Sequence, residues 1–194
     1  MKQKEAAIKI LLKKGAFADI QAMSQYDVRL VFVLAEILVT EADELLYLRA
    51  AIALAMVGSE GLPFLVHTTA NHTNPAVRLA SIQAIAKAND KRTVPTLIDA
   101  LQDSQAIVRT KAARVLGQLG DARAINALID LISNDKQHGP REGGIIALGK
   151  IGSARALTPL AQIIQSNEDP TLVACARQAI EEIQESSGVQ LPKL

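Results

Sequence analysis

Residues 115–120 are Val-Leu-Gly-Gln-Leu-Gly, and residues 147–152 are the closely similar Ala-Leu-Gly-Lys-Ile-Gly. The same pattern recurs along the chain around one leucine or isoleucine, at spacings of 31, 31, 32 and 32 residues. These anchor residues are Leu54, Ile85, Leu116, Leu148 and Ile180. An internal period of this length is typical of repeat architectures, so it decides the expected fold before any local pattern is considered.

Each repeat contains two apolar segments with the spacing of an amphipathic helix. Apolar residues recur three and four positions apart within a segment, as at Val108, Ala112, Val115 and Leu119. A second series of leucines, spaced by 32, 31 and 32 residues, consists of Leu65, Leu97, Leu128 and Leu160. The two series predict two helices in each repeat.

Helix-ending residues fall between the apolar segments. Gly120, Gly152 and Asn89 follow the last periodic residue of a segment, where a left-handed conformation ends a helix. Pro63 and Pro95 lie near the start of the next helix, where the missing amide hydrogen does little harm. One repeat is therefore an antiparallel helix pair, and such pairs must stack to bury their apolar faces. The expected fold is all-α: an α-solenoid, a right-handed superhelix of antiparallel helix pairs.

We expect one domain over residues 1–194, with an N-terminal helical cap at 1–43, repeats at 44–184 and a flexible tail at 185–194. The chain is 49% hydrophobic and 21% charged with a formal net charge of +1, which is typical of a soluble protein. The most apolar run, residues 28–40, contains Arg29 and Glu36 and is too short to span a membrane. A single cysteine cannot form an intramolecular disulfide, and no cleavage site follows residues 1–15. A cytoplasmic location is expected.

The sequence also resembles a known family. Residues 76–78, 107–125 and 149–157 resemble HEAT repeats, in particular the variant first associated with phycobilisome lyases. The resemblance covers about residues 46–184 and is strongest from 76 to 166. It implies that the helices beginning with Val-Arg line a concave side, and that the helices preceding them form a convex side.

Three positions of each Val-Arg helix are expected to point away from the core. They are Arg49, Ile52 and Met56; Ala80, Gln83 and Lys87; Lys111, Arg114 and Gln118; Gly143, Ile146 and Lys150; and Cys175, Gln178 and Glu182. The predicted partner-binding residues are Gln83, Lys87, Lys111, Arg114, Gln118, Glu142, Gly143, Ile146 and Lys150. The middle of this series is basic, whereas Asp99, Asp103, Asp130 and Asp135 lie on or beside the opposite helices. The asymmetry favours an acidic protein partner, and the alternative is an ordinary solvated face.

Arginines recur at two further places in the repeat. Arg78, Arg109 and Arg141 open successive helices, and Asp103 and Asp135 precede the last two by six residues. This pattern predicts either an anion-binding ridge or a structural ladder that ties adjacent repeats through Asp and turn carbonyls, and the family resemblance favours the ladder. The arginines beside the interhelix turns are interpreted as caps of helix C-termini. They are Arg92, Arg123 and Arg155.

One repeat departs from the pattern at residues 138–144, His-Gly-Pro-Arg-Glu-Gly-Gly. Two glycines inside a helix, Gly143 and Gly144, cost about 1 kcal/mol each relative to alanine, so a compensating contact is expected. One interpretation is a local binding site, in which a partner backbone or flat ligand approaches Gly143 closely. The other is tight packing between neighbouring helices.

Catalytic signals are nearly absent. His67, His72 and His138 have no nearby cysteine or carboxylate motif, and Cys175 lies between small apolar residues that indicate a packed thiol. No structural metal site and no cofactor are expected. The leading prediction is a non-catalytic protein-interaction scaffold or assembly factor that binds an acidic partner.

Two alternatives remain. The family resemblance implies a phycobilin lyase subunit or a bilin/phycobiliprotein chaperone, for which Arg109, Arg141, Glu142 and the glycine pair would contact the bilin. His72 is followed by threonine, which departs from the His-Cys pair of some isomerising members of that family. Nucleic-acid binding is the third class, and the absence of exposed aromatics among the lysines disfavours it.

Overall fold

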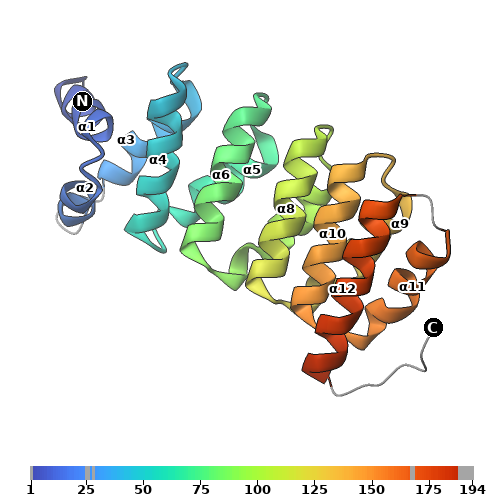
Figure 1. The fold of residues 1–194 in the computed structure, drawn as a ribbon. Coiled ribbons are helices and arrows are strands. Elements are labelled where there is room, and N and C mark those ends of the chain that lie inside the picture. Colours follow the sequence, from blue (N-terminus) through green and yellow to red (C-terminus); the bar gives the residue numbers. More distant parts are fainter. Residues whose placement is uncertain (1, 25–26, 28, 167–168, 188–194) are drawn as a thin grey trace. The chain divides into compact units, whose positions relative to one another are not determined.

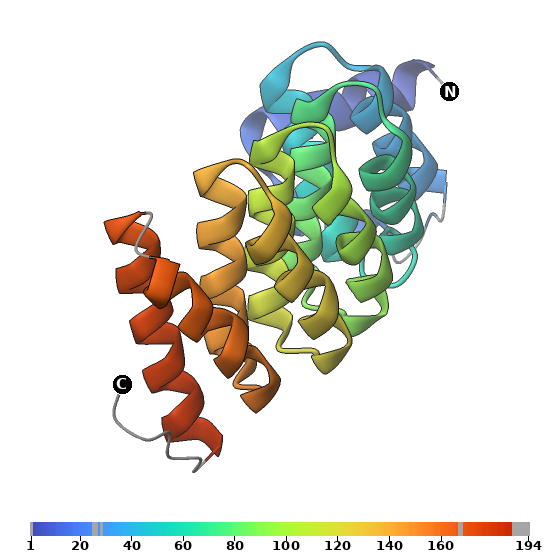
Figure 2. The same cartoon turned by 90° about the vertical axis from the view of Figure 1, so that its right-hand side faces the viewer.

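The computed structural model describes residues 2–24, 27, 29–166 and 169–187, and every regular element in these ranges is a helix. The chain forms two compact units, Met1–Asp90 and Lys91–Leu194. Each unit is built from antiparallel helix pairs (Figures 1 and 2). The chain is therefore an all-α protein of the solenoid class, as its period predicts.

The N-terminal unit contains six helices in its described residues. They are α1 (Lys2–Lys14), α2 (Phe17–Ser24), α3 (Arg29–Thr40), α4 (Glu44–Val57), α5 (Leu62–Asn71) and α6 (Pro75–Ala88). Helices α3 and α4 pack together, as do α5 and α6, and α4 lies beside α6 (Figure 1). The predicted boundary at residue 43 thus separates two helices that pack against each other.

The C-terminal unit also consists of helix pairs, and a short 3-10 turn precedes the first helix of each pair. Its helices are α7 (Val94–Asp99), α8 (Ala106–Leu119), α9 (Ile125–Asn134), α10 (His138–Ile151), α11 (Leu157–Ser166) and α12 (Pro170–Ser187). Helix α10 packs between α8 and α12 in one layer, and α7, α9 and α11 form the other (Figure 1). Helix α12 continues through Ser187, so the tail predicted from residue 185 begins inside it, and residues 188–194 lie outside the described residues.

Helix ends follow the predicted breaker residues. Asn89, Gly120 and Gly152 all have left-handed backbone, with φ of 50°, 60° and 73°. At the opposite end, the Asn74 side chain accepts a hydrogen bond from the Ala76 amide, which satisfies one of the free N–H groups at the start of α6. The local signals therefore place the turns, and the turns set the antiparallel pairing.

The periodic leucines form the core. The anchors Leu54, Ile85, Leu116 and Leu148 are fully buried. The four leucines of the second series are also fully buried. They are Leu65, Leu97, Leu128 and Leu160. Burying a side chain of this size contributes about 1.5–3 kcal/mol, so these two rows supply a large part of the packing energy.

Small residues beside the anchors set the spacing between consecutive helices of one layer. A Cβ on Gly117 would lie 2.6 Å from the Ala147 Cα, and one on Gly149 would lie 3.0 Å from the Ala179 Cα. Backbone stands in the way at both places, and it cannot be moved by a rotamer change. The recurring Leu-Gly dipeptide therefore allows α8, α10 and α12 to approach one another closely.

No helix in the described part of the chain is both long and apolar enough to cross a lipid bilayer.

Candidate functional site

Six of the predicted partner-binding residues lie in the C-terminal unit, on the side of two neighbouring helices that points away from the core. Lys111, Arg114 and Gln118 come from α8, and Glu142, Ile146 and Lys150 come from α10. Arg114, Gln118 and Lys150 are exposed, and the other three are half-buried. We call these six residues the α8–α10 face.

One ion pair spans the α8–α10 face. The Arg114 Nη2 atom lies 3.0 Å from the Glu142 Oε2 atom, and the two side chains are 50% and 27% exposed. An ion pair this exposed contributes about 0–1 kcal/mol, so it holds the two side chains only loosely. Lys111 and Lys150 form no ion pair within the described ranges, which leaves the face with an excess of positive charge.

Gly143 does not belong to this exposed surface, contrary to the binding-site prediction. It is buried, and a Cβ at this position would lie 3.1 Å from the Thr110 carbonyl oxygen on α8. A Cβ on Gly144 would lie 2.6 Å from Cγ2 of Ile132 on α9. The glycine pair therefore allows α10 to pack tightly against α8 and α9.

Arg109 joins two consecutive repeats. Its Nε and Nη2 atoms donate to the two carboxylate oxygens of Asp135 at 2.6 and 3.0 Å, and its Nη1 donates to the Asp103 carbonyl oxygen at 2.8 Å. Both side chains are largely buried, at 14% and 7% exposed. A guanidinium suits this role because its rigid set of donors serves a carboxylate and a carbonyl at once.

The electrostatics of Asp135 follow from this contact. Burial alone would raise the pKa of its carboxyl group, but the hydrogen bonds from Arg109 and from the Gln137 amide, with the charge of Arg141, outweigh burial. The net result is a pKa below the ordinary value of 3.8. Asp135 is therefore ionised near neutral pH and hydrogen-bonded to Arg109, so it is a poor candidate for a general acid or base.

The other two arginines of this series bind backbone carbonyls near the end of the preceding helix. Arg78 donates through Nη1 to the His72 and Thr73 carbonyl oxygens at 2.8 and 3.1 Å. Arg141 donates through Nε to the Ile132 carbonyl oxygen at 3.0 Å. These contacts link each guanidinium to the backbone before its own helix.

Two of the turn arginines, Arg123 and Arg155, bind groups of the preceding repeat instead of capping their own helix. Arg123 donates to the Lys91 carbonyl oxygen at 2.8 Å, which lies in the turn of the preceding repeat. Its own Asp121 holds the guanidinium in place at 2.8 Å, and this contact keeps the pKa of Asp121 well below its usual range. Arg155 donates instead to the side-chain Oδ1 atom of Asn126, in the first turn of α9, at 2.6 Å. Both arginines thus connect their own turn to the preceding repeat.

Cys175 and His138 show no arrangement for catalysis. The thiol is half-buried, and burial together with the negative charges of Glu142 and Asp169 raises its pKa, so little reactive thiolate forms near neutral pH. The His138 Nε2 atom lies 3.3 Å from Asp169 Oδ2 at the start of α12. In the part of the chain that the structure describes, no three His, Cys, Asp or Glu residues gather as metal ligands would.

In the N-terminal unit, Gln83 is half-buried and Lys87 is exposed on α6, whereas Ala80 is buried. The Arg49 guanidinium is already used, because it donates to the Leu12 and Lys13 carbonyl oxygens at 2.6 Å each. Two predicted outward positions are therefore not available to a partner.

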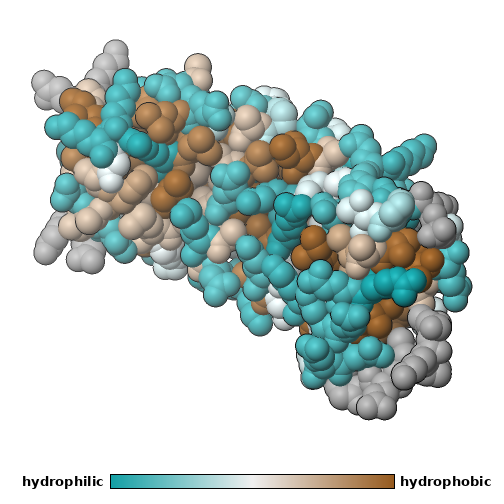
Figure 3. All heavy atoms as spheres, in the orientation of Figure 1, coloured by the Kyte–Doolittle hydropathy of each residue, from teal (hydrophilic) through white to brown (hydrophobic). Residues whose placement is uncertain are grey.

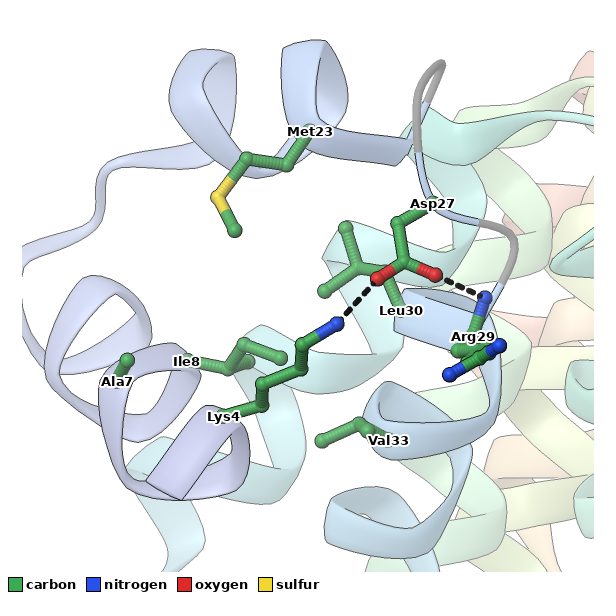
Figure 4. Close-up of a pocket in the computed structure, with 8 residues that line it drawn as sticks. All are labelled: Lys4, Ala7, Ile8, Met23, Asp27, Arg29, Leu30 and Val33. Atoms are coloured by element: carbon green, nitrogen blue, oxygen red, sulfur yellow. Dashed lines mark hydrogen bonds and ion pairs between the residues drawn. The ribbon is translucent and has the colours of Figure 1, made fainter. Parts of the chain in front are cut away.

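A pocket of about 290 Å³ opens between α1, α2 and α3 (Figure 4). Ile8, Met23, Leu30 and Val33 are among its lining residues. Lys4 and Asp27 face each other across it at 2.7 Å. Because these two charges neutralise each other and the remaining lining is mainly apolar, the pocket offers no pair of groups for acid–base chemistry.

Comparison with known protein families identifies the repeat. HEAT repeats match residues 31–113, 62–145 and 94–181, which together cover more than half of the chain. The chain is a HEAT-repeat protein. The match begins inside α3, so it includes a helix that the sequence analysis assigned to the N-terminal cap. A search of curated proteins found no significant match.

Solved structures show the same fold at low sequence identity. The complex of CpcE and CpcF of phycocyanin lyase from Nostoc sp. PCC7120 matches at TM-score 0.66 and 22% identity, over 80% of this HEAT-repeat chain and 65% of that chain. The archaeal HEAT-like repeats protein from Thermococcus onnurineus NA1 matches at TM-score 0.57 and 18% identity, over 98% and 82%. Human deoxyhypusine hydroxylase in complex with glycerol matches at 0.57 and 16%, over 91% and 80%. The chain thus spans just under two thirds of the lyase chain, and these likenesses concern the fold.

The sequence analysis missed the pairing of Glu142 with Arg114, for which the only signal was their opposite charge on neighbouring repeats. It expected Ile52 and Met56 to point away from the core, and Met56 is 37% exposed, whereas Ile52 is half-buried.

Proposed function

We propose that this HEAT-repeat protein is a non-catalytic binding scaffold or assembly factor that holds an acidic segment of a partner protein on the α8–α10 face. The observation that carries the proposal is the excess positive charge of this face. Lys111 and Lys150 lack an acidic partner among the described side chains, and the Arg114–Glu142 pair is exposed enough to open.

The electrostatics favour a partner of this kind. Two unit charges about 4 Å apart in water attract by about 1 kcal/mol, so two lysines and a released arginine supply about 1–3 kcal/mol in total. Such charges act mainly on orientation and on the rate of association, and salt screens them. The remaining affinity must come from contacts with less polar parts of the partner.

The test uses a fluorescein-labelled peptide of about ten glutamates as the probe, and fluorescence polarisation as the readout. The double variant Lys111→Glu/Lys150→Glu should weaken binding by about 5- to 30-fold, which corresponds to about 1–2 kcal/mol. Added salt should weaken binding to the unaltered protein and reduce this difference. Equal binding by the variant and the unaltered protein would remove the site assignment.

A matched control keeps net charge out of the result. Lys91→Glu/Lys136→Glu reverses the same number of charges in the same unit, at exposed positions outside the α8–α10 face. It should change the affinity by less than about twofold, because both side chains lie away from the proposed contact. A loss equal to that of the first variant would show that only net charge matters.

A second candidate is a phycobilin lyase subunit or a bilin/phycobiliprotein chaperone, and the fold shared with the phycocyanin lyase complex favours it. The glycine pair cannot form the wall of a bilin site in this role, because it is packed against Thr110 and Ile132. Absorbance and fluorescence of a linear tetrapyrrole titrated with the protein test this candidate, and a flat titration would argue for the scaffold.

A further inference from the structure

One helix of the N-terminal unit breaks the polar pattern of its layer. The positions of Leu45, Ile52 and Met56 on α4 are occupied one repeat later on α6 by Ala76, Gln83 and Lys87. In the C-terminal repeats, the position equivalent to Met56 is occupied by Gln118, Lys150 and Glu182. Helix α4 alone has apolar side chains at all three positions.

These apolar side chains are open to solvent. Leu45 is 45% exposed, Met56 is 37% exposed and Ile52 is half-buried. Figure 3, in the orientation of Figure 1, shows hydrophobic side chains gathered over the place of α4. We call these three residues the α4 patch. Large apolar side chains grouped on a surface mark an interaction site more often than isolated ones do.

The spacing of the α4 patch fits a helical partner. Its members are seven and four residues apart, so they lie on one side of the helix over about 16 Å, with Arg49 between Leu45 and Ile52 turned toward the end of α1. An amphipathic helix binds such a stripe by placing its own apolar face against it. A methionine at the end of the stripe adapts easily to different partner side chains.

The charges around the α4 patch indicate which amphipathic helix fits. The carbonyl groups at the end of α1 bind Arg49 of α4, so the exposed Lys13 and Lys14 lie beside the middle of the stripe. Lys87 is exposed on the neighbouring α6, at the position equivalent to Met56. Lysines therefore flank the middle and the Met56 end of the stripe, whereas the exposed Glu44 lies beside Leu45, and the lysines complement acidic residues on the rim of a partner helix.

We propose that the α4 patch is the docking site for an amphipathic helix of the partner, with an apolar face and acidic flanks. The proposal rests on the proposed function, because it describes a second segment of the same acidic partner. The apolar stripe supplies the affinity that the lysines of the α8–α10 face cannot supply alone, and the flanking lysines set the orientation of the helix.

The probe is a labelled peptide of about 14 residues with leucine every third or fourth position and glutamate or alanine elsewhere. A peptide of the same composition, with its leucines distributed around the helix, is the control probe. The unaltered protein should bind the amphipathic peptide at least about fivefold more tightly than the scrambled one, because only the former presents a continuous apolar face.

Variants locate the contact. Met56→Glu should weaken binding of the amphipathic peptide by about tenfold, because it removes an apolar contact and adds repulsion. Met56→Ser should weaken it less, and circular dichroism checks that both variants remain helical. Val39→Glu is the matched control, since Val39 is 43% exposed but lies on α3. Its effect should stay below about twofold.

Three results would overturn the proposal: equal binding of both peptides, an unchanged affinity in both Met56 variants, or dimerisation of the unaltered protein that Met56→Glu abolishes. The last result, seen by sedimentation equilibrium, would make a second copy of the chain the occupant. Failure of the proposed function is a separate outcome. It would appear as binding of the glutamate peptide that Lys111→Glu/Lys150→Glu leaves unchanged.

Discussion

The contact between Arg109 and Asp135 should stabilise the C-terminal unit, and Asp135→Asn isolates its charge. The Asp135 Oδ1 atom also accepts a hydrogen bond from the Gln137 amide at 2.9 Å, which an asparagine oxygen can still accept. The asparagine nitrogen would then occupy the place of Oδ2, where it faces the Nε–H group of Arg109. The substitution thus replaces the shorter hydrogen bond, at 2.6 Å, with two donors that face each other.

The size of the effect follows from burial. Exposed ion pairs contribute about 0–1 kcal/mol, and loss of one partner from a fully buried pair costs about 3–5 kcal/mol. Arg109 and Asp135 are 14% and 7% exposed, and Arg109 keeps its bond to the Asp103 carbonyl. We therefore expect Asp135→Asn to lower the free energy of unfolding by about 2–3 kcal/mol.

The assay is urea unfolding followed by far-ultraviolet circular dichroism at neutral pH. With a urea dependence of about 2 kcal/mol per molar, the expected loss moves the midpoint down by about 1 M. Asp130→Asn is the matched control, because Asp130 is exposed on α9 and the substitution removes the same charge. It should move the midpoint by less than about 0.3 M.

Acidification provides a second readout. The pKa of Asp135 is lowered in the fold, so its stabilising effect is complete above the ordinary value of 3.8 and is lost as the pH falls through the lower folded value. The gap between the unaltered protein and Asp135→Asn should be constant from about pH 7 to pH 5 and should close below 3.8. A loss under about 0.5 kcal/mol, or a gap that persists in acid, would refute the reasoning.

Three further predictions concern single positions. Thr69→Val should raise the free energy of unfolding by about 1 kcal/mol in urea unfolding, because the buried Thr69 hydroxyl has no hydrogen-bond partner among the described residues. Gly120→Ala should lower it by about 1 kcal/mol, since φ is 60° and the added methyl group touches nothing, whereas Gly120→Asn should be nearly neutral because Asn89 adopts this conformation in an earlier repeat. Glu142→Gln should strengthen binding of the glutamate peptide by about two- to fivefold in fluorescence polarisation, because it removes an anion from the face and releases Arg114.

The parts of the fold that belong to the regular repeat could be predicted from the sequence. The buried anchors, such as Leu116, recur at a spacing that only stacked helix pairs explain, and the turn residues Asn89 and Gly120 have the backbone that their residue types favour. The extra helix α2 and the pairing of α3 with α4 were missed, because α2 and α3 contain none of the regularly spaced anchors. Periodicity predicts only those elements that take part in it.

The site was less predictable, because the same residue types serve packing and binding. Gly143 occupies a nominally outward position, but the close approach of Thr110 turns it into a packing residue. Arg123 was assigned to its own turn, whereas its partner carbonyl is 32 residues away. Whether such a residue serves packing or binding depends on its distance to the neighbouring repeat. A single sequence does not give these distances.

The most direct test of the binding face is a nuclear magnetic resonance titration of the nitrogen-15-labelled protein with the glutamate peptide. The proposal predicts that the largest shifts occur at amides near Lys111, Arg114 and Lys150, and that added salt reverses them. Shifts confined to the lysines of α1, or no shift at concentrations where polarisation shows binding, would contradict it.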